Sequence, residues 1–351
     1  MAIGVSITGL GLVTSVGEGA AQACAAIRAN VVRSAPIQPA VTVMDVASNE
    51  PGLVVGCPVR GLTNGFQGLG RLKRLGAAAL RDLQREVPGS EGPEFWSDSQ
   101  IYLCLGLDVE DRMQVEAQDL ATLGQGFGDT IGVRPPVVLT RGHAAVFEAI
   151  QLASEELQLR RIRRALVLAV DSLLDEESVD WLIQQQRLKT LESPVGLIPG
   201  EAAACLVIEL PAASGAGTAP LLDAVHTIAP RPADQERAAS HVARSLSQAL
   251  GALLASSSPG SPGDLILNLN GEERGATVWG AVLSYLAKEA RNWRPRMIAP
   301  QIQLGDVGAA FGAVAVCLAV RSLSRHHARG DEVLLAAISP EGAAGFCRIR
   351  R

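Results

Sequence analysis

The chain has 351 residues, of which 48% are hydrophobic and 36 are glycine, so it can bury a large and closely packed core. Its net charge of -5 gives no electrostatic reason to bind nucleic acid or an anionic membrane, because both require clustered, uncompensated Lys and Arg. The longest late apolar run, residues 307–320, is too short to cross a bilayer and is rich in glycine and alanine. These features predict a globular protein with one helix buried in its interior.

The six cysteines are scattered without CxxC pairs, and most lie in apolar segments. This distribution favours buried thiols in a reducing compartment over disulfides or a zinc site. The N-terminus has no basic region before its apolar stretch and is interrupted by Gly4, Gly9 and Gly11, a pattern that argues against a signal peptide. We therefore expect a cytoplasmic protein with no metal and no cofactor.

Short β-rich runs alternate with helical patterns along almost the whole chain, which is typical of an α/β architecture. In chain order, strands are predicted over residues 4–10, 101–107, 136–140, 165–170, 203–210, 221–228, 264–268, 297–301, 332–337 and 345–349. Helices are predicted over residues 20–29, 69–85, 143–157, 235–255, 276–290 and 307–323.

One basic run, arginines 160, 161, 163 and 164, follows the third predicted helix. Positive charge is favourable there, because the exposed carbonyl groups at a helix C-terminus carry negative potential. The alternative interpretation is a docking patch for an acidic carrier protein.

The loop of residues 212–220 separates two sets of five predicted strands. It predicts two similar halves, residues 1–215 and 216–351. A weak internal sequence repeat supports duplication. Residues 136–143 are predicted to form a strand and a glycine turn before a helix of small residues, and residues 300–313 show the same pattern. Helices that are apolar on all sides must be enclosed on all sides, so we expect these two helices to lie between two sheets.

Three segments resemble the ketoacyl-synthase branch of the thiolase superfamily. Residues 7–17 (ITGLGLVTSVG) are similar to its opening strand and turn, residues 167–171 (VLAVD) to a strand before an acidic loop, and residues 198–209 (IPGEAAACLVIE) to its glycine-glutamate turn. The resemblance implies a five-layered αβαβα fold of two duplicated halves. It also implies dimers joined through the strand before the nucleophile, which here contains Val137, Val138 and Leu139.

Active members of this family carry out decarboxylative Claisen condensation with a Cys-His-His set, and all three positions differ in this chain. His143 stands where the nucleophilic cysteine begins the first central helix, Asn270 replaces the first histidine and Asp306 replaces the second. The family's lysine is replaced by Gln301, and Pro340 stands at the position of its gating phenylalanine. No other residue type readily replaces the thiolate in this chemistry.

His143, Asn270 and Asp306 allow two interpretations. In the first, they form a hydrogen-bonded plug that fills the old cavity, because buried polar groups usually satisfy one another. In the second, His143 stays neutral at a helix N-terminus and acts with Asp306 as a general base, while Asn270 donates a hydrogen bond to an oxyanion.

Several other polar residues are expected to have structural or surface roles. Glu201 and Asp171 match positions that the resemblance links to architecture. Glu272, Glu273 and Arg274 are expected in a solvated loop or a local ion pair. Surface or packing roles are expected for the remaining histidines, at positions 226, 241, 326 and 327.

The leading functional hypothesis is a catalytically inactive, dimeric scaffold or accessory factor for another protein, such as a bacterial type VI secretion effector. A second hypothesis is a chain-length-factor-like subunit, silent itself, that forms a heterodimer with an active ketosynthase and meets its acyl carrier. The third is an acyl-processing enzyme with a reassigned His143, Asp306 and Asn270 site. The sequence leaves these three open, because a fold by itself does not determine function.

Overall fold

The computed structural model describes residues 4–45, 49–132, 134–190, 193–211, 219–230, 235–257, 262–290 and 293–351. Its main feature is one ten-stranded sheet, in the order β12-β11-β13-β14-β10-β1-β9-β8-β6-β7. The five strands from the first part of the chain are β1 (Val5–Thr14), β6 (Ser99–Leu105), β7 (Val137–Thr140), β8 (Arg164–Ser172) and β9 (Glu201–Glu209). The five later strands are β10 (Leu221–Ile228), β11 (Asp264–Leu267), β12 (Arg296–Ile298), β13 (Glu332–Ile338) and β14 (Ala344–Arg350).

The two sets of five strands have the same topology. In each set the first strand pairs antiparallel with the fifth, the fifth pairs antiparallel with the fourth, and the fourth and third strands flank the second in parallel. The sets are joined by a short antiparallel pairing of β1 with β10, in which Val5 lies opposite Leu222. This repeated order supports the duplication that the sequence repeat indicates.

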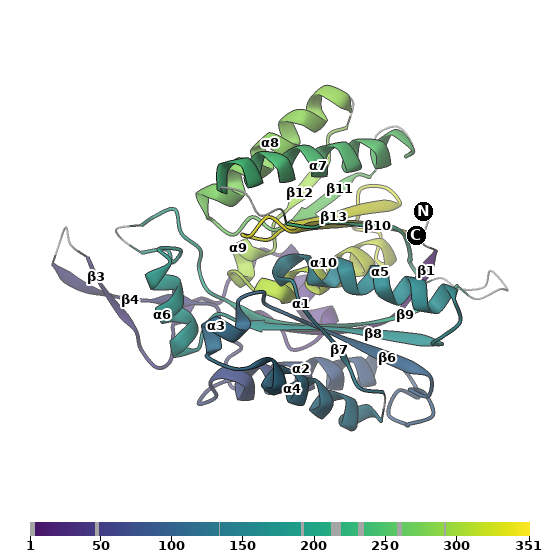
Figure 1. Cartoon of the computed structure of the whole chain (residues 1–351), viewed down its shortest axis with the longest axis horizontal. Coiled ribbons are helices and arrows are strands. Elements are labelled where there is room, and N and C mark those ends of the chain that lie inside the picture. Colours follow the sequence, from purple (N-terminus) through teal and green to yellow (C-terminus); the bar gives the residue numbers. More distant parts are fainter. Residues whose placement is uncertain are drawn as a thin grey trace.

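Helices cover both sets of strands and fill the space between them, which gives the five-layered αβαβα arrangement seen in Figure 1. The outer layers contain α2 (Gly68–Glu86) and α4 (Ala117–Ile131) on one side, and α7 (Gln235–Ala255) and α8 (Glu273–Glu289) on the other. The middle layer contains α5 (Ala145–Gln158) and α10 (Phe311–Ser324), with α1 (Ala20–Arg28) packed beside them. The α/β fold class and the layered arrangement expected from the sequence are therefore confirmed.

The two central helices are buried because the two sets of five strands cover them on opposite sides. Every residue of α10 from Phe311 to Val320 is buried, in agreement with the small and apolar sequence of this segment. Each helix begins after a short 3₁₀ turn, η1 (Gly142–Ala144) before α5 and η2 (Gly308–Ala310) before α10, and these two turns lie against each other. The starts of the two helices therefore meet at one point inside the protein.

Some elements differ from the sequence prediction. The first central α-helix begins at Ala145, since His143 lies in the 3₁₀ turn, and α8 begins one turn earlier than residue 276. Residues 297–301 do not form one strand, because β12 ends at Ile298 and Gln301 opens the helical turn α9 (Gln301–Leu304). The unpredicted helices are α3 (Val109–Met113), α4 and α6 (Glu176–Gln184). Three glycines in α4 weaken its helical pattern.

A cap lies beside the main sheet, at the left of Figure 1. It contains α6 and two small sheets, formed by β2 (Ala35–Pro36) with β5 (Val55–Gly56), and by β3 (Thr42–Asp45) with β4 (Glu50–Leu53). A separate apolar cluster that includes Ile37, Leu174 and Leu197 holds the cap together. The predicted boundary between the halves, at residues 215 and 216, lies outside the described residues.

The close approach of the central helices generates a stability prediction. A Cβ atom added to Gly312 of α10 would lie 2.7 Å from Cβ of Val146 in α5, so Gly312→Ala should destabilise the fold by about 1–3 kcal/mol through overpacking. The matched control is Gly280→Ala in α8, where a Cβ meets nothing within 4 Å and alanine should stabilise the helix by about 1 kcal/mol. Urea unfolding of both variants measures the difference, and equal effects would contradict this account of the packing.

Candidate functional site

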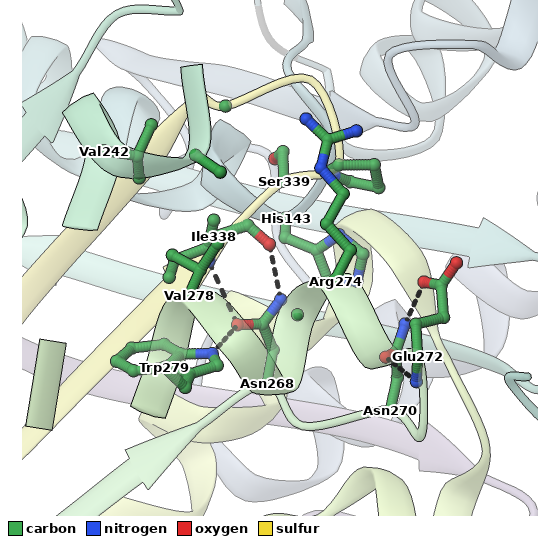
Figure 2. Close-up of a pocket in the computed structure, with 14 residues that line it drawn as sticks. His143, Val242, Asn268, Asn270, Glu272, Arg274, Val278, Trp279, Ile338 and Ser339 are labelled. Atoms are coloured by element: carbon green, nitrogen blue, oxygen red, sulfur yellow. Dashed lines mark hydrogen bonds between the residues drawn. The ribbon is translucent and has the colours of Figure 1, made fainter. Parts of the chain in front are cut away.

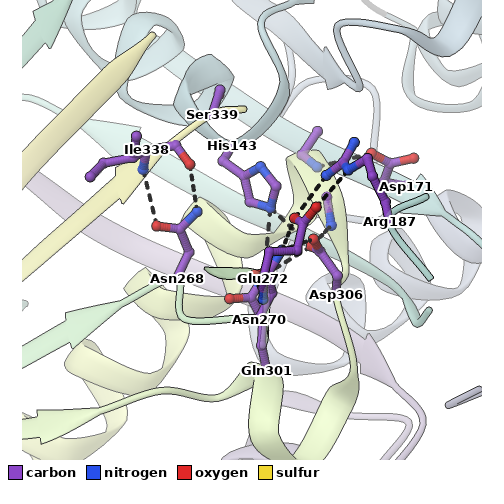
Figure 3. Close-up of polar contacts among 12 residues, drawn as sticks. His143, Asp171, Arg187, Asn268, Asn270, Glu272, Gln301, Asp306, Ile338 and Ser339 are labelled. Carbon is purple, nitrogen blue, oxygen red and sulfur yellow. Dashed lines mark hydrogen bonds and ion pairs between the residues drawn. The ribbon is translucent and has the colours of Figure 1, made fainter. Parts of the chain in front are cut away.

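The structure brings together His143, Asn270 and Asp306, the three residues expected at the site (Figure 3). His143 lies in η1, Asp306 lies just before η2, and Asn270 lies in the turn between β11 and α8. His143 and Asp306 are 163 positions apart in sequence, yet Nε2 of His143 lies 2.9 Å from Oδ1 of Asp306. Nδ2 of Asn270 donates to Oδ2 of the same carboxylate at 2.7 Å.

Asp306 is the centre of this cluster, because four donors meet its carboxylate. Besides His143 and Asn270, Nε2 of Gln301 and the backbone N–H of Gly308 each donate to Oδ1 at 2.9 Å. The backbone of Asp306 is fixed as well, because its N–H donates to Ile198 and its carbonyl accepts from Gly200. A carboxylate that accepts this many hydrogen bonds is held in its charged form and is a poor proton acceptor.

The geometry also determines the role of Gln301 beside His143. Nε2 of Gln301 lies 3.5 Å from Nε2 of His143, but the imidazole proton on that nitrogen points toward Asp306. Two donors facing each other do not form a hydrogen bond, so Gln301 binds Asp306 only. Its carbonyl oxygen Oε1 is buried and has no hydrogen-bond partner in the described part of the chain.

Electrostatics in this cluster favour an ion pair between His143 and Asp306. Burial lowers the pKa of the His143 imidazole, but the charge of Asp306 and its hydrogen bond raise it by more, so the pKa lies above the usual 6.5. Burial raises the pKa of Asp306, whereas His143, Asn270 and Gly308 lower it further, and the net pKa is well below the usual 3.8. The expectation of a neutral His143 rested on the positive end of the helix, whereas the buried carboxylate at 2.9 Å favours the protonated imidazole.

A polar chain leads from this pair toward the cap. Nδ2 of Asn270 also donates to Oε2 of Glu272 at 2.6 Å, and Glu272 accepts two hydrogen bonds from the Arg187 guanidinium at 2.7 and 3.0 Å. Glu272 therefore forms an ion pair, one of the two roles expected for it, although its partner is 85 residues away. Glu273 and Arg274 are exposed in the first turn of α8, which is helical and not a loop.

Asp171 and Glu201 form buried ion pairs that fix the backbone around the site. Asp171 binds Arg112 at 2.6 Å and accepts the backbone N–H of Ala309 in η2 at 2.9 Å. Glu201 binds Arg71 at 2.6 Å. Both carboxylates are buried and paired, in agreement with the structural roles expected for them.

A small cavity opens beside the cluster (Figure 2). Its volume is about 50 Å³, and its lining includes His143, Asn268, Asn270, Trp279 and Ser339. This space is much smaller than the volume of about 300–1,000 Å³ that is usual for small-molecule pockets. Nδ1 of His143 makes no hydrogen bond within the described residues.

All six cysteines are buried free thiols, in agreement with the sequence prediction. Burial raises the pKa of every one of them, to about 11 for Cys57 and about 12 for Cys24. None lines the cavity at His143. A thiolate nucleophile is therefore not available at this site near neutral pH.

The remaining predicted residues lie away from the cluster. Arg160 and Arg161 directly follow the end of α5, as expected for positive charge at a helix C-terminus, whereas Arg164 begins β8 and pairs with Glu209. The histidines at 226, 326 and 327 are exposed, and His241 is half-buried. No local pattern pointed to Arg187, Arg112 or Arg71, because each binds a carboxylate far away in the chain.

The described residues contain no group of three or more His, Cys, Asp and Glu side chains that is placed to hold a metal ion. Among the helices of the described ranges, none has both the length and the apolar character needed to cross a membrane.

Comparisons with solved structures show that ketosynthases and chain-length factors have the same thiolase-like fold. The ishigamide ketosynthase/chain length factor matches 99% of this chain and 99% of its own at 18% identity and a TM-score of 0.69. The complex AntDE:AntF, a type II polyketide acyl-carrier protein with its ketosynthase, matches over 100% and 99% at 13% identity and a TM-score of 0.75. ApeO with its chain length factor ApeC, from Xenorhabdus doucetiae, matches over 99% and 98% at 14% identity and a TM-score of 0.69. No protein-family model and no curated protein sequence matches the chain.

The His143–Asp306 pair predicts a specific dependence of stability on pH. Because the pKa of His143 is raised in the folded state, its contribution is fully present below pH 6.5 and is lost as the pH rises through the folded pKa. Asp306 stays ionised across this range, since its pKa is lowered. The excess stability of the wild type over His143→Gln in urea should therefore decrease from pH 6 to pH 9. A pH-independent difference, or an imidazole that titrates below 6.5 by NMR, would contradict the ion pair.

Proposed function

We propose that this protein is a non-condensing thiolase-fold subunit that works by pairing with a second thiolase-fold chain, either another copy of itself or an active ketosynthase. The observation that carries the proposal is the carboxylate of Asp306, which is bound by four donors, at a position where the family resemblance implies a catalytic histidine. In this proposal His143, Asn270 and Asp306 form a structural plug.

The absence of condensing activity is supported by the chemistry of the site. Condensation needs a nucleophile that can carry an acyl group, and His143 stands at the matching position with its Nε2 atom bound to Asp306. The cavity of about 50 Å³ beside it is narrow, which weighs against a site for a long acyl chain. The ion pair also weighs against an acyl-processing enzyme, because an imidazole that Asp306 favours in its protonated form is a poor general base.

The proposed pairing surface is β7, the strand that contains Val137, Val138 and Leu139. It lies at the edge of the ten-stranded sheet and pairs with β6 only, so one row of its backbone groups is open to a partner strand. Val137 is 38% exposed, while Val138 and Leu139 are half-buried. An exposed edge with apolar side chains favours addition of a strand from a second chain.

The comparisons favour a partner from the same fold. Two of the solved structures with this fold are described as a ketosynthase with a chain length factor, and a third as a ketosynthase with an acyl-carrier protein. A silent subunit beside an active ketosynthase therefore fits these likenesses better than an unrelated scaffold. The type VI secretion effector expected as a partner gains no support from them and stays a prediction.

A charge on the edge of β7 should break the proposed pairing. Val137→Lys places a buried charge at the contact. The dissociation constant of the pair should rise at least tenfold, which is a loss of about 1.4 kcal/mol of binding free energy. Light scattering over a dilution series measures self-association. For a heterodimer, the readout is recovery of a ketosynthase with the tagged chain from the native host.

The matched control is Met297→Lys on β12, the edge strand at the opposite end of the same sheet. Met297 is 57% exposed and occupies the equivalent strand of the second set, so this variant has the same charge change without touching β7. Equal behaviour of the two variants, or a chain that stays monomeric and recovers no thiolase-fold partner, would refute the assignment of β7.

The purified chain should form no acyl adduct. We expect intact-protein mass spectra to stay unchanged after incubation with acetyl, malonyl and octanoyl thioesters, because no cysteine lines the cavity and all six thiols have a raised pKa. Thiol release should be the same for the wild type, His143→Ala and buffer alone. Turnover that disappears in His143→Ala would establish the enzyme hypothesis instead.

A further inference from the structure

A second and larger cavity lies in the cap, and it shares no lining residue with the cavity at His143. Its volume is about 470 Å³, within the range of small-molecule pockets. The lining comes from the segment around β2, from Leu53 at the end of β4, and from residues 58–71, which lead into the first turn of α2. The cluster around His143 and Asp306 does not account for this cavity.

Hydrogen-bond donors dominate its polar lining. Arg71 is 3% exposed, and four bonds occupy four of the five N–H groups of its guanidinium: two to Glu201, one to Thr63 and one to the carbonyl of Phe66. One N–H of this buried side chain is left over. Because Glu201 fixes the guanidinium, this donor is held in place before any ligand arrives.

Three further side chains add to the excess of donors. Asn64 donates to Oε1 of Gln38, so the amide N–H groups of Gln38 are the ones left without a bond. Arg60 lines the cavity and makes no ion pair or hydrogen bond with any described residue. Both side-chain amide oxygens already accept a hydrogen bond: Oε1 of Gln38 accepts from Asn64, and Oδ1 of Asn64 accepts from the backbone N–H of Gly61.

The charge of the cavity is positive. No Asp or Glu is among its lining residues, and Glu201 is already paired with Arg71. The charge of Arg60 therefore has no partner among the described residues. An anionic group would accept charge-assisted hydrogen bonds from Arg60, Gln38 and the spare N–H of Arg71.

The remaining lining is apolar. Ile37 is buried in the floor, and Leu53 is 53% exposed, so a large apolar side chain of the cap faces solvent beside the donors. Apolar area removed from water contributes about 25 cal/mol per Å², so a ligand with an apolar body gains by covering Leu53.

We propose that the cap cavity binds a small amphipathic anion, a carboxylate carried on an apolar body, with the carboxylate at Arg60, Gln38 and Arg71 and the apolar part against Ile37 and Leu53. The site is independent of the pairing through β7 and of the plug at His143. It is a ligand site of the cap that the condensation chemistry does not use.

Calorimetry of the intact chain with octanoate tests the proposal. Two further probes each have one half of the ligand: 1-octanol has the apolar body without the charge, and inorganic phosphate has the charge without the apolar body. Octanoate should bind saturably at one site per chain, and both other probes should bind at least tenfold more weakly. Arg60→Glu should weaken octanoate about tenfold to hundredfold, the effect of losing a hydrogen bond to a charged group. The matched control is Arg81→Glu on the exposed face of α2, which should change the affinity less than twofold.

Location is tested with 8-bromooctanoate in crystals. Anomalous signal between Ile37 and Leu53 is the expected result. Signal at His143, absence of saturable binding, equal affinity for octanol, or equal effects of the two arginine variants would each overturn the proposal. Both arginines are exposed, so neither variant should prevent folding, and circular dichroism checks this.

Discussion

The complete enclosure of α5 and α10 between two sets of strands is the constraint on which the rest of the structure depends. A helix buried on all sides has to satisfy the N–H groups of its first turn without water. The start of α10 meets this requirement with two carboxylates, since Asp306 accepts from Gly308 and Asp171 accepts from Ala309. Negative charge is also favourable at a helix N-terminus. The burial of α10 therefore provides a structural reason for an aspartate at position 306.

A charge placed there needs compensation, and the surrounding residues supply it. His143 provides a positive partner, Asn270 and Gln301 add donors, and Glu272 and Arg187 extend the network to the cap. Additional hydrogen bonds offset the cost of burying a charge, and those to Asp306 do so here. The side chains around Asp306 therefore close this part of the protein by their own contacts.

The two halves share one strand order but differ in what covers them. The middle layer is built from small and apolar residues in both halves, whereas the cap belongs to the first half only. The cap contains large exposed apolar residues, and its cavity is lined by Arg60, an arginine that pairs with none of the residues whose placement is described. New binding properties are easier to acquire in such a peripheral segment than between two sheets, because its residues are not fixed by packing on all sides.

Local patterns in the sequence determined the α/β class, the burial of the cysteines, the two central helices and the turns that carry His143, Asn270 and Asp306. These features depend on hydrophobic periodicity and on glycine turns, which are local properties of the chain. The pairing of Arg187 with Glu272, of Arg71 with Glu201 and of Arg112 with Asp171 was decided only by the tertiary structure, because the partners are 85, 130 and 59 residues apart. The charge state of His143 belongs to the same class, since the local helix end favours the neutral ring and a distant carboxylate reverses that preference. The cap cavity was also decided by the tertiary structure, because packing brings its donors together from separate segments of the chain.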